Sequence, residues 1–305
     1  MSDESKPDIA TAAEASRAGA SPDGLPPLRD VISALDLRAS KALGQNFILD
    51  LNLTRRIART AGTLSGRTVV EIGPGPGGLT RALLLEGAER VIVIERDDRC
   101  RPALEAIGAR YPGRLTIHMG DALAIDWLRL VAGAPDKPII AANLPYNIAS
   151  RLLVGWLESE PWPPWWSRMI LMFQREVADR LVAVPGTKAY GRLSVISQWR
   201  ARVKLALTLG PEAFTPPPKI ASAVVDFSPI SEPAFGCSAT ALGLVTGAAF
   251  GQRRKMLRQS LKTLVPDPAA ILDAAGIAGE LRGEQLSVHD FARLTHAAER
   301  AGLQR

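Results

Sequence analysis

Apolar and polar positions between residues 51 and 183 follow two alternating periods. Short apolar runs predict buried strands, and stretches with apolar residues every three or four positions predict amphipathic helices. The predicted strands lie at 68–73, 90–96, 114–123 and 137–143, the helices at 51–62, 78–88, 98–111 and 150–159, and a strand that turns into a helix at 168–183. Strands that alternate with helices imply βαβ units, so we expect a parallel sheet covered on both faces.

The pattern changes towards both ends of the chain. Residues 203–210 and 221–230 predict two strands whose Pro-rich connection has no room for a crossover helix, so they form an antiparallel closing pair on a doubly wound α/β sheet. Residues 1–30 have almost no large apolar side chain before Leu25, and we predict a disordered extension. After Pro233 only helical patterns remain, at 238–250, 252–264, 268–275 and 287–301.

Composition excludes several classes of protein. The 305 residues suffice for one large and one small domain, and no 18-residue apolar run or secretory signal is present. The two cysteines, Cys100 and Cys237, have neither metal-ligand spacing nor a disulfide framework, so we expect a cytoplasmic protein without a metal. Residues 1–30 carry a net charge of −3 and the remainder +9. A basic body favours nucleic acid over a membrane as partner, although a merely basic enzyme also fits.

A glycine-rich turn, "GPGPGG" (73–78), follows the first predicted strand and opens the next helix. Glycines here, Gly73 and Gly75 among them, let a ligand approach the backbone closely. The spacing matches G-x-G-x-x-G, which also occurs in dinucleotide sites. Pro76 removes one backbone N–H that a pyrophosphate would need, and this argues against a dinucleotide.

Acidic residues lie at the ends of three successive strands. Glu71 belongs to the first, Glu95 follows the second, and Asp121 follows the third. Glu95 has the sequence distance from the glycines that suits ribose hydroxyls, and Asp121 could accept a hydrogen bond from an adenine amine. An acid-lined crevice suits a nucleoside that carries a cation, such as S-adenosylmethionine, better than a diphosphate.

The segment "NLPYNIAS" (143–150) follows the fourth strand. The exocyclic amine of adenine is a poor nucleophile, and an enzyme can assist it by accepting hydrogen bonds from its N–H groups. The side-chain oxygen of Asn143 and a carbonyl of the Leu144–Pro145 turn could do so, while Pro145 stiffens the turn. Tyr146 could stack on an extruded base. Taken alone, residues 143–146 would by default be interpreted as an Asn-capped turn with a buried tyrosine.

Together with "GQNF" (44–47), "KAYGRLSV" (188–195), "AFTPPPKIASAVV" (213–225) and "FGQRRKMLRQSL" (250–261), these motifs resemble the bacterial 16S rRNA adenine dimethyltransferases, the kasugamycin-sensitivity methyltransferase family. The resemblance runs from about Arg38 to the C-terminus. It implies a Rossmann-like S-adenosylmethionine-dependent methyltransferase domain over 31–232 and a helical rRNA-binding domain over 233–305. It also implies a monomer that dimethylates N6 of two adjacent adenosines in the hairpin loop near the 3′ end of 16S rRNA, within the small ribosomal subunit, with a role in subunit biogenesis.

The resemblance assigns roles to individual positions. The residues implied to hold the methyl donor are Asn46, Ile48, Gly73, Gly75, Glu95, Asp121 and Asn143. Those implied to surround the target adenosine are Asn143, Leu144, Pro145, Tyr146 and, with its ring opposite Tyr146, Phe214.

A basic run follows the predicted catalytic domain, on what the pattern predicts to be a helix over 252–264. It contains Arg253, Arg254, Lys255 and Arg258. The resemblance implies that this run grips rRNA phosphates, which would supply affinity and positioning. A solvated helical face is the alternative.

Two other functions remain open at this level. Relatives that confer antibiotic resistance methylate adenine in large-subunit rRNA, and the residue chemistry alone does not choose between the two subunits. A non-catalytic ribosome-assembly or nucleic-acid-binding factor could use the same fold, but the intact Asn143–Tyr146 segment favours catalysis. An NAD-dependent dehydrogenase is a more distant alternative.

Overall fold

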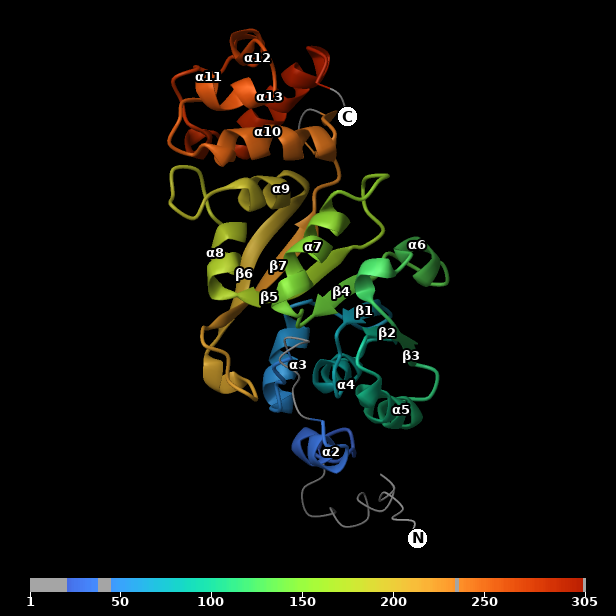
Figure 1. The fold of residues 1–305 in the computed structure, drawn as a ribbon. Coiled ribbons are helices and arrows are strands. Elements are labelled where there is room, and N and C mark those ends of the chain that lie inside the picture. Colours follow the sequence, from blue (N-terminus) through green and yellow to red (C-terminus); the bar gives the residue numbers. More distant parts are fainter. Residues whose placement is uncertain (1–20, 38–44, 234–235, 304–305) are drawn as a thin grey trace, which may run out of the picture. The chain divides into compact units, whose positions relative to one another are not determined.

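The computed structural model describes residues 21–37, 45–233 and 236–303. Seven strands form one sheet in the order β3-β2-β1-β4-β5-β7-β6 (Figure 1). The strands from β1 to β5 pair in parallel, and β7 closes the sheet as an antiparallel strand, which confirms the predicted fold class. Their bounds are β1 Thr68–Ile72, β2 Arg90–Glu95, β3 Leu115–Met119, β4 Ile139–Ala142, β5 Arg168–Gln174, β6 Ala201–Leu209 and β7 Ser222–Pro229.

The helices in the described part of the chain follow the predicted periodicity in most places. They are α2 Leu28–Ala34, α3 Leu51–Arg59, α4 Gly78–Leu85, α5 Arg101–Arg110, α6 Trp127–Leu130, α7 Tyr146–Leu157, α8 Arg175–Leu181, α9 Arg192–Arg200, α10 Ala239–Gly251, α11 Leu257–Ser260, α12 Pro268–Ala274 and α13 Val288–Arg300. Side-chain caps fix several starts: the Asp50 carboxylate accepts from two backbone N–H groups of α3, and Ser287 caps α13. Single 3₁₀ turns lie at Asp98–Cys100, Ala122–Ala124, Pro211–Ala213, Leu261–Thr263 and Gly283–Gln285.

Backbone contacts divide the chain into two units. The first comprises the described residues up to Ala149, with Trp165–Phe173 and Ala206–Val224. All residues of β1 and β4 in it are buried, as expected for central strands of a parallel sheet. Helices α3, α4 and α5 lie beside β1, β2 and β3 (Figure 1), and their apolar faces share one core cluster with these strands.

The second unit comprises Ser150–Pro164, Gln174–Leu205 and the described residues from Val225. Its core joins α9 to α10 and α13, and the rings of Tyr190, Phe250 and Phe291 pack against one another within it. The helices after Pro233 therefore share a core with a helix that precedes β6. The domain boundary at 232/233 rests on the sequence pattern and stays a prediction.

Two expectations are corrected. Disorder was expected through residue 30, and this is wrong for residues 21–30, because the Asp23 carboxylate is buried in an ion pair with Arg81. A scarcity of large apolar side chains does not reveal an ion pair with a residue 58 positions away. Residues 1–20 lie outside the described part of the chain. The basic run was expected on a helix, but residues 252–256 form the turn between α10 and α11.

Candidate active site

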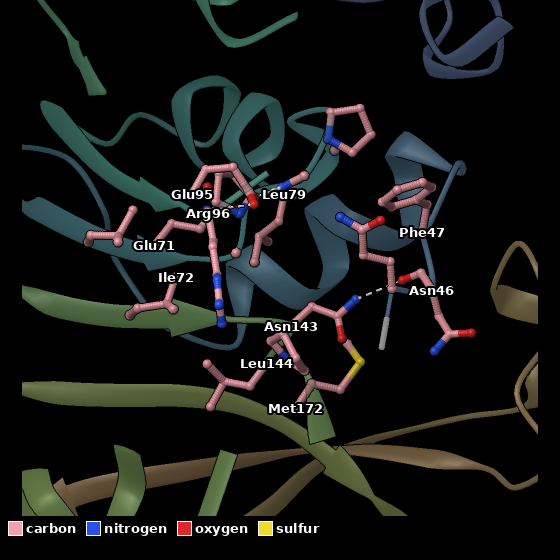
Figure 2. Close-up of a pocket in the computed structure, with 18 of the residues that line it drawn as sticks. Asn46, Phe47, Glu71, Ile72, Leu79, Glu95, Arg96, Asn143, Leu144 and Met172 are labelled. Carbon is pink, nitrogen blue, oxygen red and sulfur yellow. Dashed lines mark hydrogen bonds between the residues drawn. The ribbon is translucent and has the colours of Figure 1, made fainter. Parts of the chain in front are cut away.

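A pocket lies in the first unit, beyond the carboxyl ends of β1, β2 and β4. Ligands of open α/β sheets bind at this edge, where the strand order reverses. Figure 2 shows that its wall is built from segments far apart in the sequence, with Glu95, Asn143 and Met172 among them. Nine of the predicted site residues line it: Asn46, Ile48, Gly73, Gly75, Glu95, Asp121, Asn143, Leu144 and Pro145.

The glycine turn between β1 and α4 has backbone angles that favour glycine. Gly73, Gly75 and Gly77 have φ angles of 68°, 55° and 92°. A side chain at Gly75 would also be crowded, because its Cβ would lie 3.1 Å from Cε1 of Phe47. The turn therefore presents bare backbone to the pocket.

Glu95, at the end of β2, holds this turn in place. Its Oε2 accepts a hydrogen bond from the Gly75 N–H at 2.8 Å, and its Oε1 accepts from the N–H groups of Arg96 and Asp97, both at 2.8 Å. Burial raises the pKa of Glu95, and these three backbone hydrogen bonds partly offset that rise. A carboxylate offers about four acceptor positions, so about one remains for a ligand hydroxyl.

Glu71 of β1 is a second buried acid in the pocket wall. Its side chain is 1% exposed, and Oε2 accepts a hydrogen bond from the Thr80 hydroxyl of α4 at 2.6 Å. Burial is the main cause that raises the pKa of Glu71 to about 8. Glu71 is therefore mostly protonated at neutral pH.

We expect Glu71→Gln to remove a pH dependence of stability. An acid whose pKa is higher in the folded state destabilises the fold as pH rises, here between the ordinary value near 4.5 and about 8. Wild type should lose on the order of a few kcal/mol of unfolding free energy over this interval, and the variant, which keeps an acceptor for Thr80, should lose much less. Urea unfolding at a series of pH values measures the difference. Equal slopes for both proteins would show that Glu71 titrates normally.

Asn143, just after β4, is fixed by a contact with a distant segment. Its Nδ2 donates a hydrogen bond to the Asn46 carbonyl oxygen at 3.2 Å, drawn as a dashed line in Figure 2. This bond sets the plane of the amide and leaves its oxygen as an acceptor for another group. Two of the seven residues that the resemblance assigned to the methyl-donor site are thus bonded directly to each other.

Residues 45–47 are anchored on both sides of that bond. The Gln45 Nε2 donates to Oδ2 of Asp97 at 2.9 Å. Phe47 and Thr215 exchange backbone hydrogen bonds of 2.9 and 2.8 Å as an isolated antiparallel bridge. Three separate contacts therefore hold the "QNF" segment over the pocket, and one of them connects it to the Pro-rich loop before β7.

The turn after Asn143 starts α7. The Pro145 carbonyl accepts from the N–H groups of Ile148 and Ala149, both at 3.1 Å, so it is engaged in the helix start. Within the described residues no hydrogen bond to the Leu144 carbonyl is found, so the turn can offer this oxygen to an amine. Tyr146 is the first residue of α7, but its side chain lies outside the described part of the structure, and its stacking role stays a prediction.

Two further predicted roles also stay predictions. The Phe214 ring is 3% exposed in the core of the first unit and is not among the residues that line the pocket. It is, however, the neighbour of Thr215, which pairs with Phe47. Asp121 lines the pocket, with Oδ1 accepting from the Leu123 N–H at 2.9 Å. Its second oxygen is 3.6 Å from Nη1 of Arg96.

Several residues of the site were not predicted from the sequence, among them Asp97, Met172 and Leu28. Asp97 anchors Gln45, and a hydrogen bond from Arg99 is the main cause that lowers the pKa of Asp97. Asp97 follows Glu95 by two residues at the end of the same strand, and this position could have marked it as a site residue. Met172 lines the pocket from β5, and Leu28 lines it from α2. Nothing in the local pattern marks these two apolar residues as pocket residues.

The charged side chains that line the pocket suit a nucleoside that carries a positive charge. Among the described residues that line the pocket, Glu71, Glu95 and Asp121 are acidic and Arg96 is the basic residue. In the described ranges, no group of three or more His, Cys, Asp or Glu side chains could hold a metal ion. The same part of the chain contains no helix of the length and apolarity that a membrane crossing requires.

Two cations of the basic run form ion pairs, and two form none in the part of the chain that the structure describes. In the second unit, Arg253 Nε lies 2.9 Å from Oε2 of Glu284, and Arg258 Nη1 lies 3.1 Å from Oε1 of Glu280. Arg254 and Lys255 are exposed, and within the described residues no ion pair or hydrogen bond from their side chains is found. These last two are therefore the cations most available to a phosphate.

The profile of the ribosomal RNA adenine dimethylase family matches residues 37–299, and so nearly all of the described chain. This chain belongs to that family. It is therefore an S-adenosylmethionine-dependent rRNA adenine dimethyltransferase of Rossmann-like fold, and the predicted family, reaction class and methyl donor are confirmed.

Individual relatives agree with the family assignment. A protein of Xanthobacter autotrophicus named ribosomal RNA small subunit methyltransferase A is 58% identical over 274 residues, which cover 90% of this chain and 94% of the relative. A crystal structure of a dimethyladenosine transferase from Plasmodium falciparum has 25% identity and a TM-score of 0.71, with 83% of this chain and 98% of that chain covered. The 23S rRNA methyltransferase ErmE, at 24% identity and a TM-score of 0.62 over 83% of this chain and all of its own, shows the same fold.

Proposed function

We propose that this chain transfers methyl groups from S-adenosylmethionine to N6 of two adjacent adenosines in the hairpin loop near the 3′ end of 16S rRNA, within the small ribosomal subunit. The observation that carries the proposal is the Asn143–Asn46 hydrogen bond, which fixes an amide acceptor in the pocket that Glu95 and the glycine turn form. The small subunit is favoured over the large one because relatives with 57–58% identity bear a small-subunit name.

The chemistry requires orientation of an amine more than acid–base catalysis. S-Adenosylmethionine, when bound, supplies a methyl group that its positively charged sulfur makes electrophilic. The Asn143 side-chain oxygen and the Leu144 carbonyl would accept hydrogen bonds from the adenosine amine, which has two N–H groups before the first transfer and one before the second. These bonds increase electron density on nitrogen and direct its lone pair, and after each transfer one proton of the amine leaves to water. Glu95 and the glycine turn would hold the ribose, and residues 45–47 would cover it.

The proposal extends to partners and location. The described residues that line the pocket all come from the first unit of one chain, which supports action as a monomer. A substrate within the small subunit implies a cytoplasmic enzyme with a role in subunit biogenesis.

The test is a methylation assay with three substrates. Purified protein and labelled S-adenosylmethionine are incubated with unmethylated small subunits, with large subunits and with a control RNA hairpin, and the modified nucleosides are identified. We expect N6,N6-dimethyladenosine at two adjacent positions in small subunits only. Label in large-subunit RNA would favour the other target. Tight subunit binding without any label would favour a non-catalytic assembly role.

We expect the double substitution Arg254→Ala and Lys255→Ala to weaken binding to the small subunit. If each side chain contacts one phosphate, the slope of log affinity against log salt should become shallower by about one to two units. The effect should be nearly independent of the loop sequence, because phosphates carry no base identity. Equilibrium binding over a salt series measures it.

A matched control is Arg56→Ala with Arg129→Ala, which removes the same charge from exposed positions of the first unit. It should change the salt slope by less than half as much. If the two double variants behave alike, net charge rather than the 252–256 turn governs binding. Donor affinity should be unchanged in both.

A further inference from the structure

Residues 21–37, here called the N-terminal arm, are attached to the first unit by a buried ion pair. Arg81 of α4 binds Asp23 through two parallel hydrogen bonds, Nε to Oδ2 at 2.6 Å and Nη2 to Oδ1 at 2.7 Å. The exposed fractions of the two side chains are 3% and 0%. A bidentate arginine–carboxylate pair is geometrically specific, and a buried one is costly to break from one side.

Two further hydrogen bonds extend this attachment. Arg81 Nη1 donates to the Pro26 carbonyl at 2.8 Å, and Arg110 Nε of α5 donates to the Asp23 carbonyl at 2.7 Å. Arg81 of α4 and Arg110 of α5 thus bind the arm through two of its backbone carbonyls and through the buried Asp23 carboxylate. Its next residues form the short helix α2.

The arm also reaches the pocket. Leu28, the first residue of α2, is 6% exposed and lines the pocket together with Gly78. A Cβ at Gly78 would lie 3.0 Å from Cδ2 of Leu28, so the leucine packs closely over the first residue of α4. Arg81 lies one turn further along the same helix. Helix α4, which begins just after the glycine turn, therefore contacts the arm at two points. Arg81 binds Asp23, and Gly78 packs against Leu28 at the pocket.

We propose that the N-terminal arm is a positioning element for the methyl donor, with Leu28 as part of the pocket wall and Asp23 as the residue that anchors it through Arg81. The proposal rests on the proposed function for the identity of the ligand. If the arm detached, Leu28 would leave the wall and Arg81 would be left as an unpaired charge in an apolar setting. Docking of the arm and binding of the donor are therefore coupled, and each strengthens the other to the same extent.

The test compares Asp23→Ala with Asp30→Ala, which removes the same charge from an exposed position of α2. Calorimetry with S-adenosylmethionine should show an affinity loss on the order of 5-fold to 50-fold for Asp23→Ala, a usual range for coupled sites. Asp30→Ala should bind as wild type does. Leu28→Ala, which keeps the ion pair, should also bind the donor more weakly.

A second measurement uses the unmodified protein. Hydrogen exchange of the α2 amides should slow when S-adenosylmethionine is added to wild type and should respond much less in Leu28→Ala. This comparison and the affinity of Leu28→Ala decide the matter if Asp23→Ala fails to fold.

The outcomes separate this inference from the proposed function. If wild type binds the donor and both Asp23→Ala and Leu28→Ala bind it equally well, the arm is only a stabilising attachment and the inference is overturned. The same holds if α2 exchange does not respond to the donor. If wild type itself binds no donor, the proposed function fails instead.

Discussion

Replacement of Asn143 by alanine is expected to reduce methyl transfer by about 10²- to 10³-fold in single-turnover assays, the usual loss when one oriented polar group is removed from a reacting centre. The side chain is the amide acceptor of the pocket, and its orientation depends on the bond to the Asn46 carbonyl. Donor affinity should fall less than the rate, because the glycine turn and Glu95 remain in place. Rapid-quench measurements at saturating donor and small subunit separate the two effects.

Asn52→Ala is the matched control, since Asn52 is an exposed asparagine of α3 that does not line the pocket. It should leave the rate unchanged. Asn143→Asp adds a second comparison, because a carboxylate cannot donate to the Asn46 carbonyl and should be nearly as slow as alanine. A near-normal rate for both Asn143 variants would remove the amine-acceptor role.

Glu95→Ala is expected to weaken S-adenosylmethionine binding by about 10- to 100-fold, which corresponds to the 1.5–3 kcal/mol typical of hydrogen bonds to a charged group. The loss has two sources: the acceptor for ribose hydroxyls disappears, and the N–H groups of Gly75, Arg96 and Asp97 lose their partner. Glu95→Gln keeps one acceptor oxygen and should fall between wild type and alanine. Calorimetry with the donor measures all three proteins.

Glu105→Ala, at an exposed position of α5, serves as control and should bind the donor normally. Binding of all variants to the small subunit should be unchanged, because the cations available to phosphates lie elsewhere. Unchanged donor affinity in Glu95→Ala would mean that the nucleoside lies elsewhere in the pocket. Tighter binding of NAD than of S-adenosylmethionine by wild type would favour a dinucleotide enzyme.

The fold does not determine whether an enzyme of this kind methylates small-subunit or large-subunit rRNA. ErmE shares the fold with this chain at 24% identity, and that likeness concerns the architecture alone. The target preference proposed above rests on the high identity to small-subunit relatives. It is therefore the assay with both subunits, rather than any pocket variant, that decides it.

The sequence by itself determined the order and type of most elements between residues 51 and 230. Apolar periodicity reflects which side of each element is buried, and this is a local property that survives in any correct fold. It placed the closing strands at 203–210 and 221–230, where the structure has 201–209 and 222–229, and it located the glycine turn and the strand-end acids. Since parallel strands end at one edge of a sheet, these positions were enough to assemble seven residues of the pocket, whereas Asn46 and Ile48 were predicted only from the family resemblance.

Only the tertiary structure decided which of these residues touch. The bond from Asn143 to Asn46 joins positions 97 apart in the chain, and the one from Glu95 to Gly75 joins positions 20 apart. The ion pair of Asp23 with Arg81 spans 58 positions and lies in a segment whose composition indicated disorder. Contacts between side chains so far apart in the sequence depend on the tertiary fold of the whole chain. The local hydrophobic pattern does not encode such contacts. For the same reason the pattern predicted a helix over residues 252–264, although residues 252–256 form a turn.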